Sequence, residues 1–135
     1  MSFKIQSKII SRRFKPFIIA EMSGNHNQSL NKAIKIVETA AKCGADAIKL
    51  QTYTADTITL KSNKKDFRIK GNSPWKRYKN FWKLYNKAST PLQWHKELFE
   101  YAKKIKIEIF TSPFDESAVD YLEKLKCPAY KIASP

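Results

Sequence analysis

The sequence predicts an α/β fold whose strands are parallel. Short apolar runs alternate along the chain with longer segments in which apolar residues recur at helical spacing. Most connections between these segments are short, which favours right-handed crossovers between neighbouring strands. Polar side chains also stand at or near the end of each apolar run. A parallel sheet gathers such residues at one edge, so this pattern also indicates a functional site.

The first predicted units are a strand, a helix and a second strand. Residues 17–21 form a short apolar run that ends on an acid, as a buried strand does. Ser29 is suited to cap a helix over residues 30–43, and Gly44 follows where a left-handed residue would end that helix. Residues 46–52 then form the second strand.

The second strand has an unusual alternation of side chains. Lys49 and Gln51 share one face with Ala47, while Ile48 and Leu50 share the other. Both faces of a parallel sheet are normally covered, so a lysine and a glutamine on one of them need polar surroundings. We therefore expect Lys49 and Gln51 to line a polar interior.

A long segment over residues 53–89 separates this strand from the next helix. Its length indicates an insertion that is functional or carries its own structure. Aromatic residues within it recur at helical spacing; they are Trp75, Tyr78, Phe81, Trp82 and Tyr85. This pattern favours packing over a binding platform.

The helix after the insertion is predicted to begin at residues 90–93, which fit a capping box with proline at the first helical position. His95 lies on this helix and is expected at the surface. Residues 105–111 then form a third strand. Residues 128–133 form a fourth, after a helix that begins near Asp115.

This order of units suits either an open doubly wound sheet or half of a (β/α) barrel. A dinucleotide-binding sheet needs a glycine-rich turn after its first strand, and the sequence has none there. A full barrel needs roughly 250 residues, so we expect the N-terminal half of a TIM (β/α)8 barrel. Residues 17–135 would form this partial barrel domain, truncated after the fourth strand. Residues 1–16 would form a hairpin at its amino-terminal end.

Polar residues stand at or near the carboxyl ends of all four predicted strands. A barrel places its active site at this edge of the sheet. They are Glu21 on the first strand, Lys49 and Gln51 on the second, Thr111 and Ser112 on the third, and Lys131 and Ser134 on the fourth. A lysine between apolar neighbours must find an anionic partner, so Lys49 would meet either Glu21 or a substrate phosphate or carboxylate. Glu21 would act as a general acid or base, or simply pair with Lys49. Because Lys131 would enter the same cavity, a multiply charged ligand is favoured.

The composition argues against several other classes of protein. The formal net charge is +14, but the lysines are scattered and no nucleic-acid-binding motif accompanies them. A solvated basic surface is therefore favoured over a nucleic-acid interface. No apolar run approaches 18 residues and the N-terminus lacks a signal-like apolar core, so we expect a cytoplasmic protein with no membrane contact.

The residues that commonly bind metal are isolated from one another in the sequence. His26 has no second histidine near it, which favours a structural or substrate-contact role over metal ligation. Cys43 and Cys127 are far apart and fit no metal or redox spacing, so both are expected to be reduced.

Four segments resemble those of the sialic acid synthase family, in the same order and spacing. They are residues 18–26 (IIAEMSGNH), 44–52 (GADAIKLQT), 111–115 (TSPFD) and 128–134 (PAYKIAS). The insertion resembles the branch that makes pseudaminic acid rather than N-acetylneuraminate. The segments that carry this closer resemblance are residues 66–71, 75, 84–85, 90–91 and 94–95.

The resemblance implies a TIM barrel followed by a small C-terminal domain, in a homodimer. It implies a reaction in which phosphoenolpyruvate condenses with an amino-sugar aldehyde and phosphate is released, with the help of Mn²⁺ or Mg²⁺. The phosphoenolpyruvate ligands carried over by position are Lys49, Ser112, Lys131 and Ser134. The catalytic residues would be Glu21, Lys49 and Gln51, and the sugar-binding residues would be Asn25, His26 and Asn72.

The resemblance also implies that the metal ligands lie outside this chain. The chain is therefore expected to be an incomplete part of the enzyme and inactive by itself. Two alternatives stay open. One is an N-acetylneuraminate or legionaminate synthase, and the other is a non-catalytic basic binding module.

Overall fold

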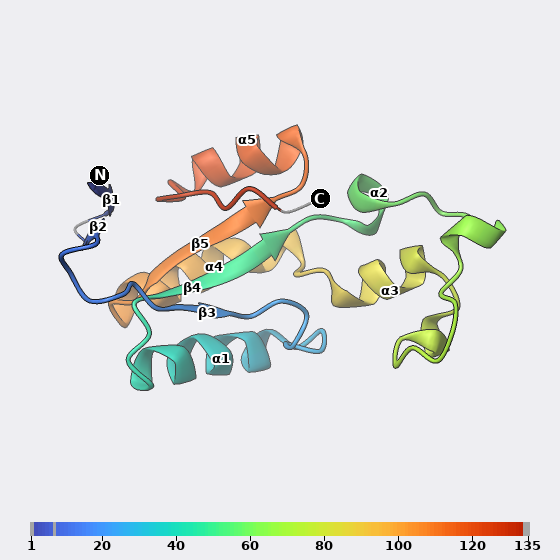
Figure 1. Ribbon diagram of the computed structural model, residues 1–135, viewed down its shortest axis with the longest axis horizontal. Coiled ribbons are helices and arrows are strands. Elements are labelled where there is room, and N and C mark those ends of the chain that lie inside the picture. The colour runs from blue at the N-terminus through green and yellow to red at the C-terminus, as the bar shows by residue number, and fades with distance from the viewer. Residues whose placement is uncertain (1, 7, 134–135) are drawn as a thin grey trace.

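The centre of the protein is a three-stranded parallel sheet. The computed structural model describes residues 2–6 and 8–133. The strands lie in the order β3 (Ile19–Glu21), β4 (Ala47–Thr52) and β5 (Glu108–Pro113) (Figure 1). Both strand pairs are parallel. The α/β fold predicted from the sequence is confirmed.

Helices α1 (Leu30–Lys42) and α4 (Leu92–Lys104) pack against one face of this sheet. The core between them includes four fully buried side chains, Val37, Ile48, Leu50 and Leu98. Lys49 and Gln51 alternate with Ile48 and Leu50 along β4, so they point to the opposite face. The two faces of β4 thus differ as the sequence predicts.

The ends of α1 follow the predicted capping pattern. The Ser29 hydroxyl accepts a hydrogen bond from the Lys32 backbone N–H, and Cys43 is the C-cap residue. Gly44 follows with φ of +80°, a left-handed conformation that glycine adopts without steric cost.

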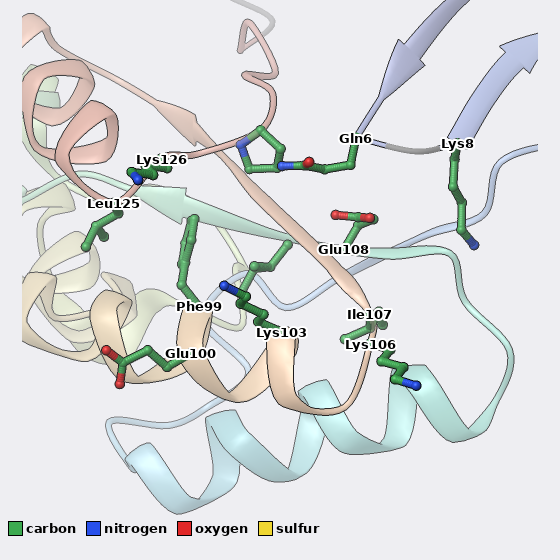
Figure 2. Close-up of a pocket in the computed structure, with 12 residues that line it drawn as sticks. Gln6, Lys8, Phe99, Glu100, Lys103, Lys106, Ile107, Glu108, Leu125 and Lys126 are labelled. Carbon is green, nitrogen blue, oxygen red and sulfur yellow. The ribbon is translucent and has the colours of Figure 1, made fainter.

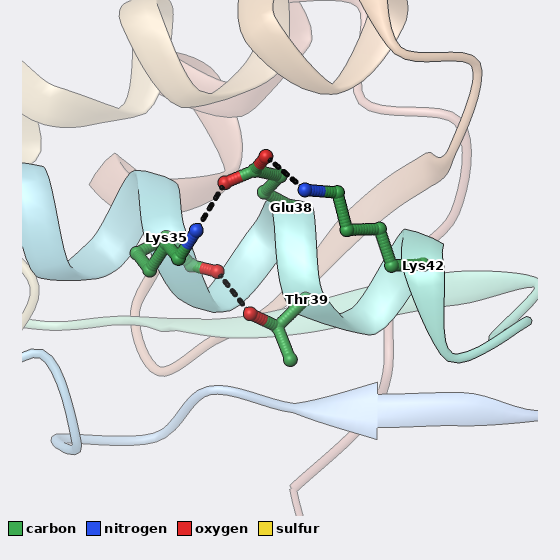
Figure 3. Close-up of polar contacts among 4 residues, drawn as sticks. All are labelled: Lys35, Glu38, Thr39 and Lys42. Carbon is green, nitrogen blue, oxygen red and sulfur yellow. Dashed lines mark hydrogen bonds and ion pairs between the residues drawn. The ribbon is translucent and has the colours of Figure 1, made fainter.

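The solvent face of α1 carries a small ion-pair cluster. Glu38 lies 3.0 Å from the Lys35 ammonium and 2.6 Å from the Lys42 ammonium (Figure 3). The Thr39 hydroxyl donates to the Lys35 carbonyl oxygen at 2.7 Å. The hydrogen bonds from the two lysines lower the pKa of Glu38 to about 2. The cluster belongs to the exposed surface of the helix.

The start of α4 differs from the prediction. The helix begins at Leu92, Pro91 occupies the N-cap position, and no side chain caps it. The Thr90 hydroxyl, which was predicted to cap the helix, instead lies 3.2 Å from the Nε2 atom of His26. The capping-box prediction is wrong because this buried hydroxyl is already bonded to another part of the chain.

Two predicted strands also differ in the structure. The strand predicted over residues 105–111 is β5, which begins later, because the preceding residues end α4 in a turn with Lys106 at φ of +61°. The strand predicted over residues 128–133 is reduced, among the described residues, to one parallel bridge between Thr111 and Tyr130. The extended segment lies beside β5 but does not form a regular ladder with it.

The insertion after β4 carries its own local structure, as the sequence predicts. Its elements are α2 (Ala55–Ile58), η1 (Lys65–Phe67), η2 (Lys76–Tyr78) and α3 (Phe81–Ala88). The aromatic stripe does not follow one continuous helix, because Lys79 adopts φ of +68° between η2 and α3. Phe81 and Tyr85 do stack on each other within α3, with their ring centroids 6.2 Å apart.

The N-terminal segment forms an antiparallel hairpin from β1 (Ser2–Ile5) and β2 (Lys8–Ser11). Its attachment to the sheet runs through Asp46, which follows α1 and precedes β4. One carboxylate oxygen of Asp46 lies 2.6 Å from the Lys8 ammonium. The other accepts a hydrogen bond from the Ile18 backbone N–H at 2.8 Å.

The last helix, α5 (Glu116–Lys124), begins as predicted. The Asp115 side chain caps it by accepting a hydrogen bond from the Ala118 N–H at 3.0 Å. Among the described residues, no helix has both the length and the apolar character that a membrane span requires.

Candidate functional site

A cavity of about 380 Å³ opens at the carboxyl ends of the three strands. We call it the carboxyl-end cavity. Its lining residues are Glu21, Lys49, Gln51, Tyr53, Ile58, Tyr85, Ser112, Phe114, Lys131 and Ala133. It therefore brings together every described residue that the sequence placed in the catalytic and phosphoenolpyruvate-binding sets. Ser134 lies outside the described residues.

Lys49 is the buried cation of this cavity. Its side chain is only 8% exposed, and its ammonium lies 3.4 Å from a carboxylate oxygen of Glu21 on the neighbouring strand. The Glu21 side chain is 59% exposed. The sequence left two partners open for Lys49, either Glu21 or a substrate anion. The structure shows Glu21 beside the Lys49 ammonium.

Polar groups from three further positions surround this ion pair. Gln51 and Ser112 lie opposite each other in the β4–β5 register, and Ser112 is buried. Lys131 is exposed at the rim, and its backbone N–H donates to the Thr111 carbonyl oxygen at 3.1 Å. Two lysines and one glutamate thus line the cavity, so its charge suits an anionic ligand.

One side of the cavity is aromatic. The Tyr53 ring meets Tyr85 and Phe114 edge to face, with ring centroids 6.1 Å and 5.3 Å apart. Burial raises the pKa of Tyr53 to about 12, so its hydroxyl stays protonated near neutral pH and cannot serve as a base there. Tyr53 and Phe114 were not predicted as part of the site from the sequence. The available signal was strand alternation, because Tyr53 and Phe114 stand two residues after Gln51 and Ser112.

The three predicted sugar-binding residues do not line the carboxyl-end cavity. Asn25 is exposed and donates from its side chain to the Met22 carbonyl oxygen at 3.0 Å. Asn72 is an exposed residue of the insertion. Neither of these two residues is among those that line the carboxyl-end cavity.

His26 is fully buried, and both of its ring nitrogens have partners within the chain. Its Nδ1 atom accepts a hydrogen bond from the Gln28 backbone N–H at 3.1 Å, which leaves Nε2 to donate to Thr90. Burial lowers the pKa of His26. The loop that carries it is held close to the insertion, since a Cβ added at Gly24 would lie 3.0 Å from the Ala88 carbonyl oxygen. These contacts give His26 a structural role, and its contact with a sugar stays a prediction.

His95 is also fully buried, so its predicted surface position is wrong. It lies three residues before Leu98 and seven before Ala102, on the buried face of α4. Its Nε2 atom is 2.8 Å from the Thr52 hydroxyl, which allows a polar ring to occupy this face. A helical projection of those spacings could have placed His95 inside.

Metal-binding groups are not gathered in the described part of the chain. No three His, Cys, Asp or Glu side chains there lie in an arrangement that could hold a metal ion. The ion implied by the family resemblance therefore has no ligand set among these residues. Cys43 and Cys127 are both free thiols, as predicted.

A second and larger hollow, of about 680 Å³, lies at the amino end of β5 (Figure 2). We call it the amino-end groove. It is bordered by the ends of α4 and α5 and by the hairpin, and its polar lining residues are Gln6, Lys8, Glu100, Lys103, Lys106, Glu108 and Lys126. None of the predicted site residues lies in it.

Comparison with known proteins identifies related chains. Residues 36–135 match the NeuB family. The pseudaminic acid synthase of Helicobacter pylori is 51% identical over 119 residues, which cover 88% of this chain and 34% of that protein. The N,N'-diacetyllegionaminic acid synthase of Campylobacter jejuni is 37% identical over 121 residues, which cover 89% of this chain and 35% of that protein.

The fold is also similar to that of a solved structure. The N-acetylneuraminic acid synthetase of Leptospira borgpetersenii superposes with a TM-score of 0.79 at 25% identity, over 98% of this chain and 41% of that one. The chain spans about a third of the length of the curated relatives that it matches.

Proposed function

The chain belongs to the NeuB family, and we propose that it contributes the phosphoenolpyruvate-binding part of a synthase that makes pseudaminic acid. The higher identity to the Helicobacter pylori synthase, 51% against 37% for the legionaminic acid synthase, supports this choice of sugar. The observation that carries the proposal is the convergence of Lys49, Gln51, Ser112 and Lys131 on one cavity.

Phosphoenolpyruvate carries a phosphate and a carboxylate, so its recognition needs cations and hydroxyl donors. In the proposal, Lys49 and Lys131 meet its anionic oxygens, and the Ser112 hydroxyl donates to one of them. Charge-assisted hydrogen bonds of this kind are shorter and stronger than neutral ones. Ser134 is included on the position of its motif alone.

The proposed reaction forms one carbon–carbon bond and releases phosphate. Carbon 3 of phosphoenolpyruvate bonds to the aldehyde carbon of an amino sugar, and the aldehyde oxygen gains a proton. Water adds at carbon 2, the bond between carbon 2 and the bridging oxygen breaks, and inorganic phosphate leaves. Glu21 and Gln51 face the same cavity as Lys49, so they are suited to orient the aldehyde and the water.

We also propose that residues from 17 onward form the first half of a TIM barrel in a homodimeric enzyme. The helices on one face of β4 and the polar residues at the carboxyl ends of the strands support this architecture. A divalent ion, manganese or magnesium, would be held by residues outside the described part. Chelation with EDTA should therefore stop turnover, and added Mn²⁺ should restore it.

Isotope tracing in the complete gene product tests the reaction and the sugar together. Phosphoenolpyruvate labelled with ¹⁸O at the bridging oxygen is incubated with the acceptors of the pseudaminate, legionaminate and neuraminate synthases in turn. We expect turnover with the pseudaminate acceptor and the label in the released phosphate. Turnover with another acceptor would assign a different sugar product to the enzyme. Label retained in the sugar product would exclude cleavage of the bond between carbon 2 and the bridging oxygen. No turnover with any acceptor would overturn the proposal.

A further inference from the structure

A buried chain of hydrogen bonds lies directly behind the carboxyl-end cavity. The Thr111 and Thr52 hydroxyl oxygens are 2.8 Å apart, and the Thr52 hydroxyl oxygen is 2.8 Å from Nε2 of His95. The Nδ1 atom of His95 is 3.2 Å from the Pro91 carbonyl oxygen. All three side chains are completely buried, so the chain of bonds connects β5, β4 and the start of α4 without water.

The chemistry of the groups fixes the direction of every bond. A carbonyl oxygen only accepts, so Nδ1 of His95 must carry the proton. Its Nε2 atom is then a bare acceptor and takes the single hydroxyl proton of Thr52. The Thr52 oxygen can therefore only accept from Thr111, which donates. Burial lowers the pKa of His95, which keeps the ring in the neutral form that this order needs.

The two threonines stand next to residues of the cavity. Thr52 follows Gln51, and Thr111 precedes Ser112, so strand alternation turns the threonines toward α4 and their neighbours toward the cavity. Gln51 and Ser112 are also opposite each other in the β4–β5 register. Any shift of one strand end against the other would therefore move these two cavity residues apart.

The first turn of α4 is itself held in place from α5. The Tyr121 hydroxyl donates to the Leu92 carbonyl oxygen at 2.8 Å, and the Tyr121 ring meets His95 edge to face with centroids 6.0 Å apart. The histidine is thus fixed by a backbone carbonyl on one side and by a ring from a second helix on the other. It offers its Nε2 acceptor at a defined position.

We propose that His95 is a positioning residue for phosphoenolpyruvate, acting through Thr52 and Thr111 on Gln51 and Ser112. This inference rests on the proposed function of the carboxyl-end cavity. The Nδ1–H tautomer is essential to it, because only this form accepts a proton from Thr52. An apolar residue of similar size could fill the same space but could not set the direction of the two hydroxyl groups.

Two matched pairs of variants in the complete gene product separate positioning from packing. In His95→Gln the amide can reach the place of Nε2, so its oxygen still accepts from Thr52. In His95→Asn the shorter amide reaches only the place of Nδ1, so it keeps the bond to Pro91 and loses the bond to Thr52. Thr52→Ser keeps the hydroxyl at the centre of the chain, and Thr52→Val removes it with little change of shape.

We expect His95→Asn and Thr52→Val to raise the KM for phosphoenolpyruvate about tenfold, as the loss of one buried hydrogen bond would. His95→Gln and Thr52→Ser should stay close to the wild-type KM. Melting temperatures are measured in parallel, because a purely structural role would lower stability and leave KM unmoved. Long-range ¹H–¹⁵N spectra of the wild-type protein should show the shift pattern of the Nδ1–H tautomer.

An Nε2–H tautomer, or equal KM values within each pair, would overturn the inference. If the wild-type protein binds phosphoenolpyruvate while the pairs do not differ, only the positioning role fails. If the wild-type protein does not bind phosphoenolpyruvate, the proposed function fails and the positioning role falls with it. Titration of the wild-type protein with phosphoenolpyruvate therefore distinguishes failure of the positioning role from failure of the proposed function.

Discussion

The carboxyl-end cavity and the amino-end groove lie at opposite ends of the sheet and differ in how they hold charge. The groove is the larger, about 680 Å³ against about 380 Å³. Its lysines, at positions 8, 103, 106 and 126, are all exposed and stand on the hairpin, on α4 or on turns. In the smaller cavity Lys49 stands on a central strand and is nearly buried.

The proposed site is thus the smaller of these two hollows, and it differs from the groove in the burial of its lysine. An exposed lysine is solvated and needs no partner, whereas a lysine withheld from water costs free energy unless an anion compensates it. Lys49 meets that need through Glu21 at 3.4 Å. In the proposed function, phosphoenolpyruvate therefore binds in the carboxyl-end cavity, and the groove is a solvated surface.

The largest effect is expected when the buried lysine is replaced. Lys49→Met should weaken phosphoenolpyruvate binding by about tenfold or more, because a hydrogen bond to a charged group contributes roughly 1.5–3 kcal/mol. The matched control is Lys103→Met in the amino-end groove, which should leave binding unchanged. Calorimetric titration of both variants checks the contrast. Equal affinities would remove Lys49 from the site.

Lowering the pH should destabilise the carboxyl end of the sheet before it destabilises the amino end. Burial lowers the pKa of His26 and of His95, both of which lie near that end. In the unfolded chain these histidines take up protons near pH 6.5, whereas in the folded chain they do so only at lower pH. Their contribution to stability is thus complete above about pH 6.5 and is lost as the pH falls toward the folded values.

Urea unfolding and amide hydrogen exchange at pH 7.5 and pH 5.5 measure this loss. We expect lower stability at pH 5.5 and faster exchange near Thr52 than near Ile107. A variant carrying both His26→Gln and His95→Gln should lose most of the pH dependence. A wild-type protein equally stable at both pH values would show that the histidines are not buried in solution.

A smaller effect is expected when two lysines of the amino-end groove are replaced, and it should concern stability alone. Lys106 and Lys126 follow α4 and α5 with φ of +61° and +55°, a conformation that glycine adopts with less strain. Lys106→Gly and Lys126→Gly should each stabilise the protein by about 0.5–1 kcal/mol and leave phosphoenolpyruvate affinity unchanged. Denaturant unfolding and titration check both parts. A weaker affinity for phosphoenolpyruvate in either variant would indicate that the groove takes part in binding.

The smallest effect is expected on the solvent face of α1. The pKa of Glu38 is lowered to about 2 by Lys42 and Lys35, so its contribution is present above its ordinary pKa and is lost as the pH falls toward 2. Exposed ion pairs contribute little, so Glu38→Gln should barely change the melting temperature at pH 7. A large decrease would mean that the cluster has a role beyond the helix surface.

Much of the fold could be predicted because local rules decide it. Ser29 and Gly44 mark the ends of α1, and the alternation along β4 separates Lys49 and Gln51 from the apolar core. The capping box at Thr90 could not be judged locally, because its hydroxyl bonds to a histidine 64 residues away. A preference for local capping gives way when a buried partner competes for the same group.

The polar residues of the proposed site were predicted from the sequence, whereas the aromatic residues Tyr53 and Phe114 and the buried position of His95 were not. Strand-end polarity identified Lys49 and Ser112, because charged and hydroxyl groups on buried strands are unusual. Tyr53 and His95 gave no such signal, since aromatic rings and helical histidines are common in packing roles. Strand alternation and helical spacing indicate on which face each residue lies, but the contacts that they make join β4 to α3 and to α4, which are far apart in the sequence.

The most direct test of the account is a crystal structure of the complete gene product with phosphoenolpyruvate. We expect the ligand in the carboxyl-end cavity, with its anionic oxygens within hydrogen-bond distance of the Lys49 and Lys131 ammonium groups and the Ser112 hydroxyl. Ligand density in the amino-end groove, with the carboxyl-end cavity filled only by solvent, would contradict the central claim.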